Sequence, residues 1–384
     1  PRRCARTPSS RMSTGPAPEE YPQLPGPARF INDVVTDLSE GKSVVIVFPD
    51  ALVESGVAEA ILEEVAREGA NAEFCHASSD PLPTRIITTF GVDVVAHREF
   101  DEWDTIVNWE PWHGAWVLLP GWEHDDLDEI TDRWPAQLQV CGLAIADRPR
   151  LILAARLSEL SRATIAHLDR ATIAVHWWWG VLDRLDTETR LAAVGGRSFN
   201  PVENAVITEL ASWDLALVDH LTTRWDRTAS GVEEAIESFS LASAPNPVVE
   251  STGSAPRRAC SAPPVELEEQ WRTGVVDQWG HQIRWATYIL DDSRIQRLLW
   301  LAHNRTLMLH VDEERVHYEA MLLPKAAPHV LEGLWRRVDD IIEIGSLAWL
   351  VETGRVDVSR AHRTRLSAFR DLRNLLAHRT PVDD

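Results

Sequence analysis

Near the end of the chain, four side chains that could act on a phosphodiester recur at helical spacing. Arg370, Asn374 and His378 are spaced four residues apart, so on a helix they form one stripe, which Arg373 flanks. An imidazole can take a proton from an RNA 2′-hydroxyl or give one to the leaving 5′-oxygen. A guanidinium can bind the phosphate through two hydrogen bonds, and Asn374 can orient a group or hold the phosphate. This set indicates RNA cleavage that requires no metal.

The alternative is a structural role, because basic side chains at a helix C-terminus also compensate the helix dipole and stay solvated. The charge distribution favours phosphate binding. The chain has a net charge of −21, yet the segment from 355 to 379 holds seven arginines against two aspartates, a local +5. Such acidity excludes a protein that coats nucleic acid over its whole surface. We expect Arg363, Arg370 and Arg379 to contact RNA phosphates.

A helix over 359–380 is predicted to position these side chains. Its apolar residues recur at three- and four-residue spacing and are predicted to form a core-facing stripe of Leu366, Phe369, Leu372, Leu375 and Leu376. The polar stripe lies on a second face, so we expect it to be exposed.

The string from Arg373 to His378 resembles the Arg-Asn-x-x-x-His motif of the HEPN family. Segments 294–324 and 338–354 also resemble a HEPN subgroup found behind STAND-like domains, except that Leu309-His310 stands where that subgroup commonly has a proline break. The resemblance covers about 293–380. It implies a compact helical bundle that acts as a homodimeric, metal-independent endoribonuclease without cofactors. The implied catalytic residues are Arg373, Asn374 and His378.

The N-terminal half predicts an α/β domain with a mainly parallel sheet. Residues 44–48 (VVIVF) form an apolar, β-branched run typical of a buried parallel strand, and a helix over 57–68 follows. Further predicted strands lie at 72–78, 84–90, 114–121, 149–155 and 171–179, separated in part by helices such as 125–134. Residues 181–240 indicate a helical subdomain. This order of elements resembles STAND-type or AAA-like NTPase cores over about 25–240.

The nucleotide motifs of such a core are missing. A phosphate loop needs glycines, a lysine and a Ser/Thr after the first strand. The segment 48–57 has one glycine, no lysine and two carboxylates, and Gly41-Lys42-Ser43 precedes the strand. Glu123, Asp125 and Asp126 follow the strand at 114–121, where a magnesium carboxylate would belong, but they are typical of a solvated helix start. The resemblance therefore implies an inactive NTPase-like scaffold.

The predicted organisation has four parts. Residues 1–24 are expected to be disordered, 25–240 form the NTPase-like domain, 241–265 are a Pro/Ser/Ala-rich linker and 266–384 form the HEPN-like domain. Helices are predicted over 266–290, 293–309, 311–322, 328–353 and 359–378.

Three further sequence features bear on packing and on location in the cell. Trp177-Trp178-Trp179 is predicted to be buried in a core or subdomain seam, with base stacking or a partner surface as the alternative. The four cysteines are too scattered for a disulfide framework or a cysteine zinc site, which fits an intracellular location. No apolar run reaches the ~20 residues of a membrane helix, so we expect a soluble, cytoplasmic protein without membrane contact.

The leading hypothesis is a ribonuclease effector of a prokaryotic defence or conflict system, in which 25–240 senses or docks a protein partner and the substrate is transfer or messenger RNA. The alternatives are a non-catalytic adaptor that uses both domains as binding surfaces, and a residual nucleotide-binding switch. We expect no ATP or GTP binding, because the loop after Phe48 lacks the phosphate-binding residues.

Overall fold

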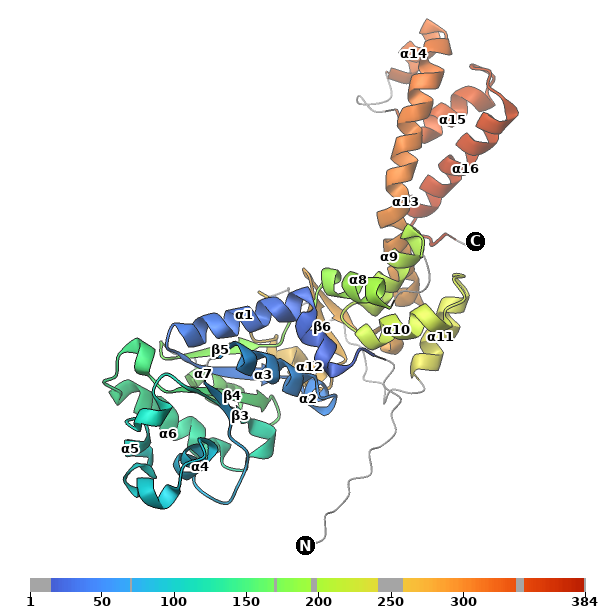
Figure 1. Ribbon diagram of the computed structural model, residues 1–384. Coiled ribbons are helices and arrows are strands. Elements are labelled where there is room, and N and C mark those ends of the chain that lie inside the picture. The colour runs from blue at the N-terminus through green and yellow to red at the C-terminus, as the bar shows by residue number, and fades with distance from the viewer. Residues whose placement is uncertain are drawn as a thin grey trace.

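The computed structural model describes residues 15–69, 71–168, 171–194, 199–240, 258–335 and 342–382. Along the elongated molecule lie a parallel sheet with its helices, a small β-hairpin segment beside it, a helical subdomain and a C-terminal helical region (Figure 1). The predicted combination of an α/β region with an all-α region is thereby confirmed. Most of the predicted linker, residues 241–257, lies outside the described residues.

The sheet consists of five parallel strands in the order β2-β3-β4-β1-β5. Their bounds are β1 Ser43–Phe48, β2 Ala72–Phe74, β3 Trp116–Pro120, β4 Arg150–Arg156 and β5 Ile173–Trp177. Central β1 is buried along its whole length, with Val44 opposite Ile152 on one side and Ala174 on the other. Burial on both faces explains why its sequence is a continuous apolar run.

Helices cover the sheet on both faces (Figure 1). They are α1 Pro25–Ser39, α2 Asp50–Glu54, α3 Val57–Glu68, α4 Leu82–Thr89, α5 Trp103–Ile106, α6 Leu127–Val140 and α7 Arg162–Leu168. Short 3₁₀ turns lie at Val94–Phe100, Glu110–Trp112, Gly121–Glu123 and Ile145–Asp147.

The predicted strand over 84–90 is wrong, because this segment lies in helix α4. Its Thr and Ile residues favour strands by intrinsic propensity. Pro83 within the first turn is compatible with a helix start, and Leu82, Ile86 and Ile87 are buried at helical spacing. Burial of these apolar side chains in the tertiary structure therefore outweighs the strand propensity of the segment.

The predicted disorder of residues 1–24 is corrected for its described part. Residues 1–14 lie outside the described residues, but Pro18–Gln23 form a 3₁₀ helix, and Leu24 is buried in the core of the helical subdomain. The Gly26 N–H then donates to Asp186 Oδ1 at 2.7 Å. A Cβ at Gly26 would lie 2.1 Å from the Val181 carbonyl oxygen, so only glycine allows this approach.

The helical subdomain comprises α8 Arg184–Ala193, α9 Pro201–Ala211, α10 Leu215–Arg224 and α11 Gly231–Ser240. Its apolar core includes Leu210 and Val218 and continues into the first turns of a later helix through Leu299 and Ala302. The subdomain therefore packs against the start of the C-terminal region.

The predicted helix over 266–290 is wrong, and the C-terminal helical region begins only at Asp292. Residues 258–290 contain the 3₁₀ turns Val265–Leu267 and Thr287–Ile289, helix α12 Glu268–Arg272, and an antiparallel hairpin of β6 Val276–Trp279 and β7 Gln282–Trp285. Gly280 forms the turn with φ +60°. Leu267 and Trp271 join the core of the sheet domain, which explains why this segment does not extend the helical bundle.

Burial of the tryptophan triplet is confirmed. Trp177, Trp178 and Trp179 are at most 5% exposed, and the outer two contact Trp271, with ring centroids 6.0 and 6.3 Å away. Trp177 and Trp179 thus lie in the seam between the sheet and residues 258–290, whereas Trp178 packs on Phe30 and Phe48 in the core of the sheet domain. His176 is packed as expected, and its Nε2 lies 2.8 Å from Asp37 Oδ2.

The C-terminal region is built on one long helix, α13 Asp292–Leu322. The two helices predicted over 293–309 and 311–322 are continuous, because the segment contains neither proline nor glycine. After a 3₁₀ turn at Leu323–Lys325 come α14 Pro328–Trp335, α15 Ile344–Glu352 and α16 Arg360–Ala377. None of the helices in the described ranges is long and apolar enough to cross a bilayer.

Candidate nucleic-acid site on the C-terminal helix

Helix α16 is fixed against α13 near both of its ends. Ser359 caps its N-terminus by accepting the His362 N–H, and the Tyr318 hydroxyl donates to the His362 carbonyl at 3.0 Å. At the other end, Trp300 Nε1 donates to the Leu376 carbonyl at 2.7 Å. These bonds orient the candidate residues that follow Phe369.

The predicted core stripe of α16 is only partly buried. Leu366 and Leu376 are 1% exposed, and Phe369 and Leu372 are half-buried, but Leu375 is 39% exposed. Among the described elements the helix packs mainly against α13 and α15, and Leu375 lies outside the core that they form. The prediction that Leu375 is core is therefore wrong.

His378 ends α16 as its C-cap residue, where its N–H donates to the Asn374 carbonyl at 3.0 Å. Arg379 follows with φ +58°, which stops the helix. Asn374 and His378 are both exposed, as their position on the second stripe predicts. The C-terminus of a helix carries partial negative charge, so a phosphate bound here would depend on nearby arginines.

Two of the candidate arginines, Arg373 of the motif and Arg370 before it, pair with carboxylates at the two ends of α15. Arg373 Nη2 lies 2.7 Å from Glu343 Oε2 at the start of α15. Arg370 bonds Glu352 at the end of α15 and lies 3.0 Å from Asp371. The structure thus places Asn374 and His378 on one exposed stripe, while both arginines are held in ion pairs. Exposed pairs of this kind contribute little energy, so a phosphate can replace the carboxylate.

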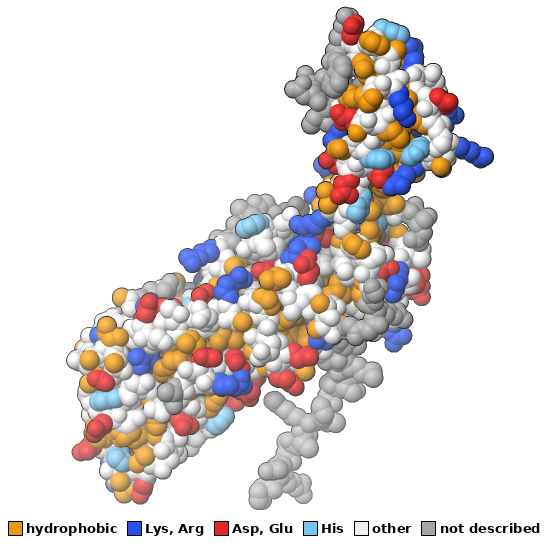
Figure 2. Space-filling view, turned by 45° about the horizontal axis from the view of Figure 1, so that its top comes forward, with side chains coloured by type: hydrophobic (Ala, Val, Ile, Leu, Met, Phe, Trp, Pro, Cys, Tyr) orange, Lys and Arg blue, Asp and Glu red, His pale blue; other side chains and the backbone are white. Residues whose placement is uncertain are grey.

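The basic segment is more neutral than its sequence predicts. Arg365 bonds Glu314, and Arg363 lies 3.6 Å from Asp357. Arg379 instead lies over the ring of Trp300, 5.9 Å from its centroid. Basic, histidine and hydrophobic side chains lie side by side on this region of the surface (Figure 2).

The segment where a phosphate loop would stand folds differently. Residues after β1 form the short helix α2, and its first residue, Asp50, is buried and pairs with Arg272 of α12 at 2.7 Å. Arg272, which follows the helical subdomain in sequence, therefore contacts the segment after β1.

Two of the three carboxylates considered for magnesium, Asp126 and Glu123, are engaged by protein groups, and Asp125 is exposed. Buried Arg85 donates to Asp126 Oδ2 at 2.5 Å and to His124 Nδ1 at 2.8 Å, and Glu123 lies 3.1 Å from His76. A guanidinium can only donate, so the His124 proton sits on Nε2, which donates to the Cys75 carbonyl. Burial, together with Arg85, lowers the pKa of His124. Within the described ranges, no group of three His, Cys, Asp or Glu side chains could hold a metal ion.

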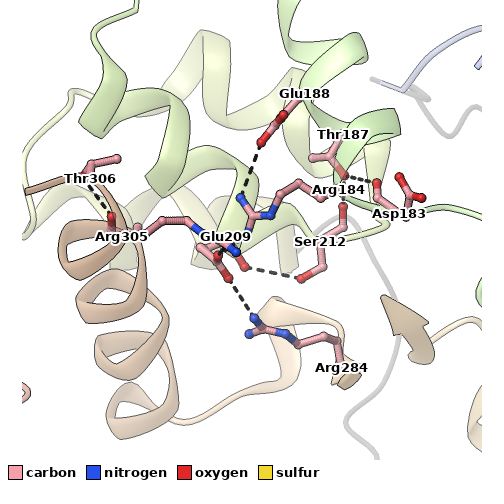
Figure 3. A network of polar contacts seen from close by, with 10 residues as sticks. Asp183, Arg184, Thr187, Glu188, Glu209, Ser212, Arg284, Arg305 and Thr306 are labelled. Atoms are coloured by element: carbon pink, nitrogen blue, oxygen red, sulfur yellow. Dashed lines mark hydrogen bonds and ion pairs between the residues drawn. The ribbon is translucent and has the colours of Figure 1, made fainter. Parts of the chain in front are cut away.

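Sequence inspection missed a cluster in the helical subdomain. The buried carboxylate of Glu209 bonds Arg184, Arg284 and Arg305, which are 25, 75 and 96 residues away in sequence (Figure 3). No local pattern links residues at such separations.

Comparison with known proteins gives little guidance. No protein-family model matches the chain. No curated protein matches it either. Among solved structures, the chain is similar to a point variant of Thermotoga maritima RuvB, with 10% sequence identity over 76% of this chain and 79% of that chain. The TM-score of 0.28 is too low for this likeness to support an argument about fold or function.

Proposed function

We propose that this protein is a metal-independent endoribonuclease whose site is the C-terminal end of a HEPN-like helical domain. The supporting observation is the exposed pair Asn374 and His378 at the end of α16, with Arg373 and Arg379 beside them. Arg363 and Arg370 would extend the phosphate-binding surface along the helix.

The chemistry follows from the side chains. His378 takes the proton of the 2′-hydroxyl, the 2′-oxygen attacks phosphorus, and the bond from phosphorus to the 5′-oxygen breaks. The products are a 2′,3′-cyclic phosphate and a 5′-hydroxyl. Arg373 leaves Glu343 and stabilises the charge on the phosphate oxygens. Asn374 positions the phosphate.

This reaction needs a second acid to protonate the leaving oxygen. The other histidine of α16, His362, is 16 residues away, about 24 Å along the helix axis, and cannot reach. We therefore propose that a second copy of the chain supplies a second His378 across a composite cleft. The C-terminal helices expose the apolar side chains Leu309, Val316, Trp349 and Leu375, of which Leu375 lies on α16 beside Asn374 and offers apolar surface to the second copy.

For the N-terminal region we propose an inactive NTPase-like scaffold that docks a protein partner in a prokaryotic defence system. Support for an inactive scaffold comes from the segment after β1, which forms helix α2 with Asp50 paired to Arg272 and has no lysine for a triphosphate. The substrate would be transfer or messenger RNA.

A non-catalytic adaptor is the second candidate, favoured by the ion pairs of Arg370 and Arg373. In that case both regions act only as binding surfaces, and the arginines orient α15 and α16.

The test is incubation of the purified full chain with total RNA and with transfer RNA in the presence of EDTA. We expect cleavage that leaves 2′,3′-cyclic phosphate ends, and at least a hundredfold loss in His378→Ala, since acid and base catalysis contributes about 10² to 10⁴ in rate. Arg373→Ala should lose a similar factor.

His310→Ala is the matched control, because His310 is an exposed histidine of α13 that pairs with Glu313 at 3.2 Å. Equal cleavage by the wild type and both site variants would refute the proposed site. No cleavage by the wild type, together with partner capture that persists in the double variant, would favour the adaptor.

A further inference from the structure

A cavity of about 440 Å³ lies between α8, α9 and α13, and none of the candidate RNA-site residues of α16 lines it. This volume is within the range of small-molecule sites. Apolar side chains such as Phe199 form part of its wall. Convergent polar groups from Arg184, Asn204, Thr208, Arg305 and Thr306 form another part.

Arginines outnumber carboxylates in the cluster at the cavity wall. Glu209 is 3% exposed, and its Oε1 accepts from Arg184 and, at 2.9 Å, from Arg305, while its Oε2 accepts from Arg284 at 2.8 Å (Figure 3). One carboxylate thus faces three guanidinium groups. Glu188 also lines the cavity, 3.5 Å from Arg184, so the cluster holds three guanidinium groups and two carboxylates and keeps a net positive charge.

Of the two cavity arginines, Arg184 is held in place before any ligand arrives, as is Arg284 behind the cavity. Arg184 and Arg284 both lie over the ring of Trp279, 4.7 and 5.5 Å from its centroid. Arg284 is further fixed by its own bond to Glu209. Preorganised donors of this kind bind an anion without a further cost for ordering side chains.

Both cavity arginines retain donors for an anion. A guanidinium carries five N–H groups, and Arg305 is 57% exposed and makes one bond to Glu209. Arg184 directs its two terminal nitrogens to Glu188 and Glu209, and the exposed Glu188 can be displaced. Two converging guanidinium groups match the oxygens of a phosphate.

We propose that this cavity binds a small phosphate ester that carries a flat ring, of the size of a mononucleotide. The phosphate lies between Arg184 and Arg305, the ring packs on Phe199, and Asn204, Thr208 and Thr306 supply hydrogen bonds. This inference does not depend on the proposed ribonuclease activity.

The test is isothermal titration of the full chain with AMP, inorganic phosphate and adenosine. We expect one AMP per chain, with adenosine binding at least tenfold more weakly because it lacks the phosphate. Arg305→Gln should weaken AMP at least tenfold, and its exposed position should leave the melting temperature within a few degrees.

A steric pair of variants tests the cavity without altering an arginine. Ala192 lines the cavity on α8, whereas Ala193 is exposed and does not. Ala192→Trp should abolish AMP binding, and Ala193→Trp should leave it unchanged. The proposal is overturned by absent AMP binding, by equal binding of adenosine, or by AMP binding that neither Arg305→Gln nor Ala192→Trp weakens.

Discussion

The ion pairs of arginines differ in burial between two regions of this molecule, the helical subdomain and helix α16. In the helical subdomain, three of them share the buried carboxylate of Glu209. On α16, Arg370 and Arg373 each pair with an exposed carboxylate of the neighbouring helix α15. The first arrangement joins α8, α9, β7 and α13 around one charge, whereas the second joins two adjacent surface helices.

The difference shows that the environment decides what an ion pair contributes. A buried charge that loses its partners is costly, whereas an exposed pair is nearly neutral and can be exchanged for another anion. The Glu209 cluster should therefore govern stability, and the α16 pairs should govern access to ligands.

The largest effect is expected for Glu209→Gln. Removing this charge leaves three guanidinium groups around a buried site, so the free energy of unfolding should fall by about 3 to 5 kcal/mol. Urea denaturation followed by tryptophan fluorescence measures it. A loss no greater than that of an exposed acid would contradict the proposed role of Glu209.

The buried carboxylate of Asp277 extends the comparison, because backbone N–H groups bond it where arginines bond Glu209. Asp277 accepts the Gly180 and Gln278 N–H groups, and burial raises its pKa to about 8. In the unfolded chain its pKa is near 3.8, so between pH 4 and 8 only the folded state keeps the proton. Stability should therefore fall as the pH rises through this window, by up to about 1.4 kcal/mol per unit. Asp277→Asn should flatten that slope, measured by urea denaturation across pH.

An intermediate effect on stability is expected at the C-terminal end of α16, where Trp300 contacts it. Trp300→Phe removes the hydrogen bond to the Leu376 carbonyl and weakens the contact with Arg379, so unfolding should become easier by about 1 kcal/mol. Hydrogen exchange should show faster opening of the last turn of α16. Unchanged exchange there would mean that Trp300 does not anchor this turn.

The smallest stability effect is expected for Glu343→Gln, less than about 1 kcal/mol. Because Arg373 loses its carboxylate partner, RNA affinity should rise a few-fold, measured by fluorescence anisotropy in the His378→Ala background. Glu40→Gln is the control, since Glu40 is an exposed partner of Lys42 in the sheet domain. Equal gains in both variants would point to net charge alone.

The sequence predicts most of what depends on local pattern. The VVIVF strand and the helix at 57–68 are both found where their apolar patterns place them, and exposure of Asn374 and His378 follows from their stripe. The hairpin at 276–285 was missed although its signal is present. Val276, Gln278, Ile283 and Trp285 flank a Gly280 turn with the period of strands.

What depends on distant contacts could not be predicted. Nothing near Asp50 indicates that Arg272 pairs with it, because 222 residues separate them. The same holds for Glu209 and its three arginines. The net charge counted within residues 355–379 also overstates the positive charge of this surface. Glu314, Glu343 and Glu352 lie outside that segment and form ion pairs with its arginines.

Helix α13 links the two proposed binding sites through consecutive turns. Trp300 holds the end of α16, His303 accepts the Val382 N–H, and Arg305 borders the cavity, all within about 8 Å of helix axis. If the two sites are coupled through this stretch, thermodynamics requires reciprocity. Whatever factor AMP imposes on RNA affinity, RNA must impose on AMP affinity, so a titration of either ligand would report on the other.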